Sequence, residues 1–170
     1  MASALLLIDV QRNMLEPPSP VPDATAVAAA ITDLLDRARR AGATVVHVRN
    51  NGDAGVGDPD APGSPGWELV HQPFPEEIVA DKFSSDSFEG TGIAERLPAG
   101  AVVVVAGMQS EYCVRATSVS ALARGYRVVL ASGAHATYPD DGSAAEISAR
   151  IERELAAAGV DVLPHDGIRF

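Results

Sequence analysis

The segment AVVVVAGMQSEYC, residues 101–113, joins a continuous apolar run to a short polar turn that ends at Cys113, the one cysteine of the chain. The apolar run is too short for a helix and is typical of a strand buried on both faces of a parallel sheet. The residues after the turn predict a helix that starts at Cys113 and ends near residue 124, before Gly125. Strand, turn and helix in this order are the repeating unit of an α/β fold.

The same alternation of apolar runs and helical patterns continues in both directions. Strands are predicted at residues 4–8, 43–48, 77–82, 101–106, 127–131 and 160–163. Helices are predicted at residues 23–41, 91–97, 113–124 and 143–158, the first N-capped by Asp23 and the last by a capping box of Ser143 and Glu146. This order predicts a three-layer α/β/α fold with a six-stranded, mostly parallel sheet. Because we find no repeat and no linker, we expect one domain over residues 1–170.

Composition and charge exclude several classes of function. The net charge of −10 and the lack of a Lys/Arg run argue against a nucleic-acid partner. The apolar start, residues 1–13, is too short to span a bilayer and has no signal-peptide pattern, so no membrane partner is expected. One cysteine cannot form an internal disulfide, which favours a cytoplasmic location.

Three chemically versatile residues follow predicted strands: Asp9, Lys82 and Cys113. In a parallel sheet these strand ends meet at one edge, where ligands bind. A thiol at a helix start is stabilised as thiolate by the helix dipole, and the N–H groups there can bind an oxyanion. Asp9 would accept the thiol proton, and Lys82 would hold both groups in place. Taken singly, each residue also has a structural interpretation. Asp9 could form a surface ion pair, Lys82 could be a solvated surface lysine, and Cys113 could be a buried core residue.

The sequence around these residues resembles the isochorismatase-like cysteine hydrolases, which include nicotinamidases and N-carbamoylsarcosine amidase. The segment LLIDVQ, residues 6–11, is similar to the opening strand of that family and its catalytic aspartate. Lys82 followed by SFEGT, residues 87–91, and VAGMQSEYCV, residues 105–114, resemble two further motifs of the family. The three motifs occur in the family's order, and the resemblance extends over nearly the whole chain.

The resemblance implies specific roles for residues of this chain. Cys113 corresponds to the nucleophile, Asp9 to the base and Lys82 to the third member of a catalytic triad. A non-proline cis peptide is implied between Met108 and Gln109, and the backbone N–H groups of Gln109 and Cys113 are implied as oxyanion donors. The resemblance also implies a homodimer or a homotetramer.

Two departures from the family pattern concern metals and substrates. After Gln11 the chain lacks the acid and the aromatic residue that many members carry. The nicotinamidase metal motif is also missing, since residues 47–53 read HVRNNGD and the four histidines do not pair at metal-ligand spacing. We therefore expect no metal and no other cofactor. Nicotinamidase activity and the vinyl-ether hydrolysis of isochorismatases are disfavoured.

The substrate pocket is expected to include aromatic residues near these motifs. Trp67 follows a long stretch, residues 50–66, with five glycines and three prolines, and is predicted to form a pocket wall. Phe88 and Tyr112 are candidates for the same reason. His135, beyond the end of the fifth predicted strand, is a further candidate.

The sequence therefore predicts a cysteine-dependent hydrolase that cleaves a small amide-like C–N bond of a small-molecule substrate through a thioester. The alternative is a catalytically silent scaffold of the same family that binds a metabolite or a protein partner. A nucleotide- or flavin-binding protein is a third hypothesis. The first strand-to-helix turn, residues 9–13, argues against it, because it has no G-x-G-x-x-G motif to bind a pyrophosphate.

Overall fold

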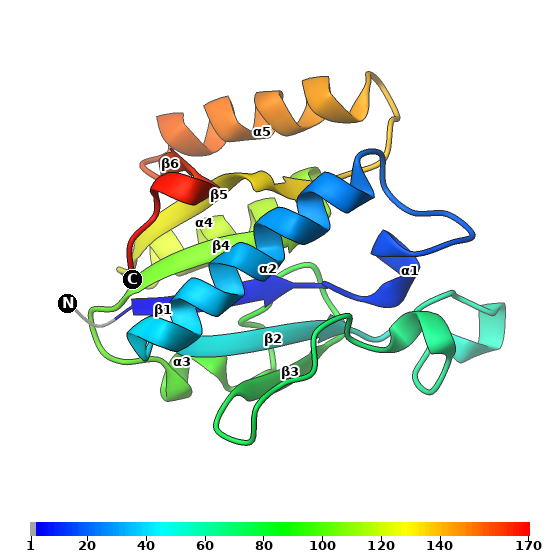
Figure 1. Ribbon diagram of the computed structural model, residues 1–170, viewed down its shortest axis with the longest axis horizontal. Coiled ribbons are helices and arrows are strands. Elements are labelled where there is room, and N and C mark those ends of the chain that lie inside the picture. The colour runs from blue at the N-terminus through cyan, green and yellow to red at the C-terminus, as the bar shows by residue number, and fades with distance from the viewer. Residues whose placement is uncertain (1–2) are drawn as a thin grey trace.

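A computed structural model, which describes residues 3–170, contains a six-stranded sheet with the strand order β3-β2-β1-β4-β5-β6 (Figure 1). All five pairs of neighbouring strands are parallel. The strands are β1 (Ser3–Ile8), β2 (Thr44–Asn50), β3 (Ile78–Lys82), β4 (Val102–Met108), β5 (Arg127–Ala136) and β6 (Asp161–Pro164). The predicted three-layer α/β/α fold is confirmed, with a sheet that is entirely rather than mostly parallel.

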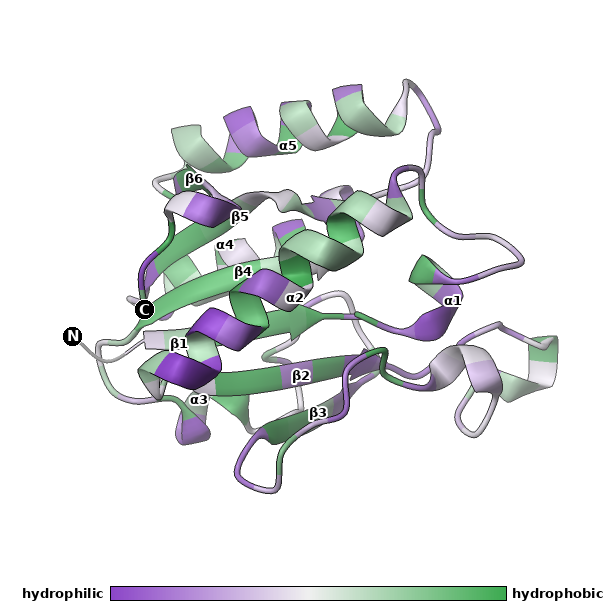
Figure 2. Ribbon diagram, in the orientation of Figure 1, coloured by the Kyte–Doolittle hydropathy of each residue, from purple (hydrophilic) through white to green (hydrophobic). Residues whose placement is uncertain are grey.

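Helices cover both faces of this sheet (Figure 1). They are α1 (Arg12–Leu15), α2 (Ala24–Ala41), α3 (Ile93–Arg96), α4 (Arg115–Ala123) and α5 (Ala144–Ala157). Leu5 and Leu7 of β1 pack with α2 on one face, and Leu6 and Ile8 pack with residues of α3, α4 and α5 on the other. Strands β1 and β4 are accordingly mostly hydrophobic, whereas α2 and α5 also carry hydrophilic residues (Figure 2). No helix within residues 3–170 has the length and apolar character needed to cross a membrane.

The helix ends follow the predicted pattern only in part. Ser143 and Glu146 form the expected capping box at the start of α5. Asp23 does occupy the N-cap position of α2, but it has a left-handed backbone with φ of 58° and its side chain makes no capping hydrogen bond. The helix predicted to start at Cys113 begins earlier, because a π-helical segment, Ser110–Val114, precedes α4.

Strand β5 extends to Ala136, beyond its predicted end at residue 131. The pairing of β4 with β5 shifts in register between Val105 and Gly107, and this irregularity lets β5 continue past Gly133. As a result His135 lies within the strand, paired with Gly107, and not in a loop beyond it.

The strand order reverses between β1 and β4, since the chain proceeds from β1 to β2 and β3 on one side and from β4 to β5 and β6 on the other. In open α/β sheets this switch point, at the carboxyl ends of the strands, is where ligands bind. Asp9 follows β1 at this edge, Lys82 ends β3, and the segment with Cys113 follows β4.

A buried carboxylate, that of Glu77, ties three parts of the fold together. It accepts hydrogen bonds from Arg39 of α2, from His47 of β2 at 2.9 Å and from the backbone N–H of Phe74 at 2.8 Å. The Glu77 side chain is 4% exposed. Burial raises the pKa of this carboxyl, but the bonds from Arg39, Phe74 and His47 outweigh burial and lower the pKa to about 2.

We expect Glu77→Gln to lower the free energy of unfolding at pH 7 by roughly 2–3 kcal/mol. The folded-state pKa lies below the ordinary glutamate value of 4.5, so this stabilisation is present above pH 4.5 and is lost as the pH falls towards 2. Urea unfolding at pH 7 and pH 3 measures both effects, with the exposed neighbour Glu76→Gln as matched control. Equal stability of the two variants at pH 7 would contradict this role of Glu77.

Candidate active site

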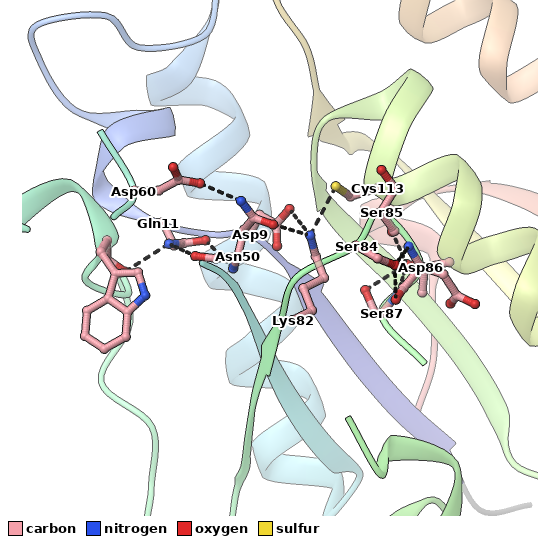
Figure 3. Close-up of polar contacts among 12 residues, drawn as sticks. Asp9, Gln11, Asn50, Asp60, Lys82, Ser84, Ser85, Asp86, Ser87 and Cys113 are labelled. Carbon is pink, nitrogen blue, oxygen red and sulfur yellow. Dashed lines mark hydrogen bonds and ion pairs between the residues drawn. The ribbon is translucent and has the colours of Figure 1, made fainter. Parts of the chain in front are cut away.

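Lys82 stands at the centre of the residues that meet at the switch point (Figure 3). Its Nζ atom lies 3.0 Å from Oδ2 of Asp9 and donates hydrogen bonds to Sγ of Cys113 at 3.2 Å and to Oδ1 of Asn50 at 2.9 Å. The side chain is fully buried. An ammonium has three hydrogens and no acceptor, so these three partners use its complete donor capacity and fix its position.

Asp9 has one carboxylate oxygen bound and one free. Oδ2 pairs with Lys82, whereas Oδ1 is buried and has no hydrogen-bond partner among the described residues. The backbone N–H of Asp9 donates to the Val48 carbonyl at 2.9 Å, and its φ of 50° lies in the left-handed region that aspartate tolerates better than most residues. Burial raises the pKa of Asp9 to about 6, although the charge of Lys82 opposes that rise.

The thiol of Cys113 differs from the sequence-based expectation. A helix start was expected to favour the thiolate, but the pKa of Cys113 is raised to about 11. Burial is the main cause of the raised pKa. The negative charge of Asp9 raises the pKa further, by more than the positive charge of Lys82 lowers it. Cys113 also lies in the fourth position of the π-helical segment and not at the start of a helix. The resting thiol is therefore neutral at pH 7.

The turn that carries Cys113 has an unusual backbone. The peptide bond between Met108 and Gln109 is cis, as the resemblance implied. The Gln109 carbonyl accepts hydrogen bonds from the N–H groups of Tyr112 at 3.2 Å and Val114 at 3.1 Å, on either side of Cys113. Gly107, with φ of 119°, packs so closely on β1 that a Cβ atom there would overlap the Ile8 carbonyl. This contact holds the end of β4 directly against the strand that leads to Asp9.

A cavity of about 640 Å³ opens beside these residues. Asp9, Gln109, Tyr112 and Cys113 line it together with two further segments. The residues of the first segment are Arg12, Asn13 and Met14 of α1 and Glu16, Pro17, Pro18 and Ser19 after it. Those of the second are Asp58, Pro59, Asp60, Pro65 and Gly66, and Asn50 and Tyr138 complete the lining. Of the four predicted pocket residues, Tyr112 lines this cavity and is 53% exposed.

Trp67 and Phe88 do not line the cavity, contrary to the prediction. The indole N–H of Trp67 donates to Asn51 at 2.6 Å, and the Arg49 guanidinium lies over the ring, 3.6 Å from its centroid. Phe88 is buried in the core and stacks on Tyr126, with 6.2 Å between ring centroids. Both aromatic rings thus pack against residues that do not line the cavity.

His135 is also placed differently from the prediction. Its ring is buried, with Nδ1 2.8 Å from Ser110 Oγ and Nε2 3.2 Å from the Glu152 carboxylate. It lines a second cavity, of about 470 Å³, between β5 and the start of α5, whose lining does not include Cys113. The register shift in β5 explains the difference, because it keeps His135 inside the sheet.

Three polar residues of the site were not singled out from the sequence: Gln11, Asn50 and Asp60. Gln11 bonds to the backbone of Asn50 through both ends of its amide, at 2.8 and 3.1 Å. Asn50 contacts Lys82, and Asp60 accepts a hydrogen bond from Asn50 at 2.7 Å. The position of Asn50 at the carboxyl end of β2, next to the strand of Lys82, is the signal that points to it.

The cavity lining carries more carboxylates than cations. Arg12 is the one basic side chain in it, and its guanidinium is already paired with Glu16 at 2.8 Å and Glu68 at 2.9 Å. Asp58 and Asp60 have no basic partner within 4 Å among the described residues. A lining of this sign attracts cationic ligands and repels anionic ones. Within residues 3–170 no group of three or more His, Cys, Asp or Glu side chains is arranged to hold a metal ion.

Comparison with known proteins agrees with this geometry. The family model of the isochorismatase domain matches residues 3–163. A streptothricin hydrolase of Streptomyces noursei is 42% identical over 95% of this chain and 68% of its own length. The crystal structure of an isochorismatase from Pseudomonas putida KT2440 superposes with a TM-score of 0.88 at 30% identity, over 98% of this chain and 89% of that one. An N-carbamoylsarcosine amidase from Thermoplasma acidophilum has a TM-score of 0.84 at 25% identity, with both chains fully covered.

Proposed function

The chain belongs to the isochorismatase family of hydrolases, and we propose that it cleaves a small amide-like C–N bond through a thioester on Cys113. The observation that carries the proposal is the contact of Lys82 with both Asp9 and Cys113, while Oδ1 of Asp9 is buried and has no hydrogen-bond partner within residues 3–170. The names of two similar proteins, streptothricin hydrolase and N-carbamoylsarcosine amidase, support a C–N bond as the target.

In the proposed first half-reaction, Asp9 acts as a general base. Its free Oδ1 takes the proton from the Cys113 thiol while the sulfur attacks the substrate carbonyl. The negative charge that develops on the carbonyl oxygen is stabilised by the backbone N–H groups of Gln109 and Cys113. The tetrahedral intermediate collapses, the C–N bond breaks, and the nitrogen leaves with the proton that Asp9 returns.

In the second half-reaction a water molecule replaces the amine. Asp9 takes a proton from water as it attacks the thioester, and the sulfur leaves as the acid is released. Lys82 stays protonated throughout and balances the charge on Asp9 and on the sulfur. The proton that Asp9 took from water then passes to the sulfur of Cys113, which restores the resting enzyme.

The two raised pKa values determine how the first step proceeds. The pKa of Cys113, about 11, lies well above the pKa of Asp9, about 6, so at neutral pH the proton rests on sulfur and Asp9 is ionised. We therefore expect proton transfer to accompany the attack of sulfur on the carbonyl, because a thiolate formed beforehand is unfavourable. Below about pH 6 Asp9 becomes protonated and cannot act as a base. We therefore expect kcat/KM to fall as the pH is lowered through 6.

The cavity supports a substrate that is small and not anionic. A volume of about 640 Å³ fits a metabolite-sized molecule, and Asp58 and Asp60 in the lining disfavour a carboxylate there. A cytoplasmic location is part of the proposal, because the cysteine must remain reduced to react.

The proposal is tested by following ammonia or amine release from primary amides, N-carbamoyl compounds and lactams. The panel includes three amides matched in size but different in charge: malonamate, propionamide and β-alaninamide. We expect the cationic and neutral amides to exceed the anionic one in kcat/KM by about tenfold at low salt, with a smaller ratio at high salt. One equivalent of iodoacetamide should stop all release, because the chain has one cysteine. No release from any compound would favour the silent scaffold, and release that survives alkylation would contradict the thioester route.

A further inference from the structure

Asn50 connects the Lys82 ammonium to a carboxylate outside the proposed triad (Figure 3). Its Oδ1 accepts from Lys82 Nζ at 2.9 Å, and its Nδ2 donates to Oδ2 of Asp60 at 2.7 Å. An ammonium can only donate and an ionised carboxylate can only accept. The orientation of the Asn50 amide is therefore fixed by its two partners, with the oxygen towards Lys82 and the nitrogen towards Asp60.

The backbone of Asn50 is fixed as well. Its N–H donates to Oε1 of Gln11 at 2.8 Å, and its carbonyl accepts from Nε2 of Gln11 at 3.1 Å. The same Nε2 atom also donates to the Trp67 carbonyl at 3.0 Å. With the backbone held on both sides, the main freedom left to Asn50 is a rotation of its amide group. Asp60 opposes this rotation from the nitrogen side of the amide, as Lys82 does from the oxygen side.

Asp60 belongs to the long glycine- and proline-rich segment between β2 and β3 and reaches the site from there. Its backbone carbonyl accepts from the Gly52 N–H at 3.0 Å, which closes the loop onto the end of β2. Asp60 makes no hydrogen bond or ion pair with Asp9, Lys82 or Cys113. Burial is the main reason that the pKa of Asp9 is raised, and the charge of Asp60 adds to it.

We propose that Asp60 is a positioning residue, which acts through Asn50 to direct the Lys82 ammonium at both Asp9 and Cys113. Without the carboxylate, the Asn50 amide loses the partner that holds its nitrogen, so its oxygen is less firmly held as the third acceptor of the Lys82 ammonium. The long loop thereby becomes part of the catalytic geometry. This inference rests on the proposed function, since it assigns a role within the same reaction.

The test compares Asp60→Ala and Asp60→Asn on a neutral amide, so that the charge of the substrate plays no part. We expect Asp60→Ala to lower kcat about tenfold with KM nearly unchanged, the size of effect that a lost hydrogen bond to a charged group produces. Asp60→Asn retains an oxygen that can accept from Asn50 and should restore most of kcat. Both variants should move the acid side of the kcat/KM profile to lower pH, because a negative charge near Asp9 is removed.

Two further variants separate positioning from general loop damage. Asp53→Ala removes a carboxylate from the same loop, outside the cavity, where it accepts from the Gly55 N–H at 2.7 Å. This control should leave kcat and the pH profile as in the wild type. If Asp60 acts through Asn50, Asn50→Ala combined with Asp60→Ala should lose no more activity than Asn50→Ala alone.

The inference is overturned if Asp60→Ala behaves like Asp53→Ala, or if the losses of the two single variants multiply in the double variant. Thermal melting of each variant separates a loss of fold from a loss of kcat. The pH profile of kcat/KM is also measured for Asp60→Asn, which keeps the shape of the side chain. Failure of the proposed function is a different result, since Cys113→Ala would then retain turnover whatever the Asp60 variants do.

Discussion

Cys113→Ala is expected to lower kcat/KM for any amide substrate by at least about 10⁴-fold, the loss typical of removing a covalent nucleophile. The sulfur would form the bond to the carbonyl carbon, and no other described side chain of the site offers an equivalent nucleophile next to the unpartnered oxygen of Asp9. Alanine leaves Lys82 with two of its three acceptors, Asp9 and Asn50, so the fold should persist. Activity assays and thermal melting of the same preparation measure both.

Cys113→Ser is the matched control for this prediction. Serine keeps an acceptor for Lys82 but has a hydroxyl that is far harder to deprotonate than a thiol. We expect a melting temperature close to that of the wild type and a loss of activity nearly as large as in Cys113→Ala. Full activity of either variant would show that the thiol forms no covalent intermediate.

Asp9→Asn is expected to change hydrolysis and thiol reactivity in opposite directions. Hydrolysis should fall by about 10²–10⁴-fold, because the general base is lost. The pKa of Cys113 is raised first by burial and then by the charge of Asp9, so neutralising Asp9 removes the second cause. We expect the pH midpoint of alkylation by iodoacetamide to fall by about one unit or more. Lys82, still protonated, would then stabilise the thiolate.

Lys82→Met is the counterpart of Asp9→Asn in this experiment. The ammonium lowers the pKa of Cys113, so its removal should raise the midpoint of alkylation while hydrolysis again falls. Circular dichroism should confirm that each variant is folded, because Lys82 is fully buried and its loss leaves Asp9 without a counter-ion. Midpoints that move in the same direction in both variants would contradict the electrostatic account of the site.

Much of the fold was predictable from local pattern. Apolar runs bounded by turn residues identify strands that are buried on both faces, as β1 and β4 are. The end of β5 was not predictable in this way, because the register shift opposite Gly107 arises from the pairing of two strands that are distant in sequence. His135 was misplaced for this reason alone.

The candidate site was predictable where it depends on the ends of strands and on the family's motifs. Asp9, Lys82 and Cys113 meet because their strands are parallel and end at one edge. The thiol pKa was not predictable, since it depends on the balance of burial, Asp9 and Lys82 in three dimensions. Asp60 was missed because a glycine-rich loop has no periodic pattern that reveals its path back to Asn50.

The central claim is that the acyl part of the substrate is bound to Cys113 during turnover, and rapid-quench mass spectrometry tests it most directly. The enzyme is mixed with an excess of a substrate amide, quenched in acid within milliseconds, digested, and analysed for the mass of the peptide that contains Cys113. We predict a mass increase equal to the acyl group on Cys113 in the wild type and none in Cys113→Ala. Turnover with an unmodified Cys113 at every quench time, or an acyl group on another residue, would contradict the account.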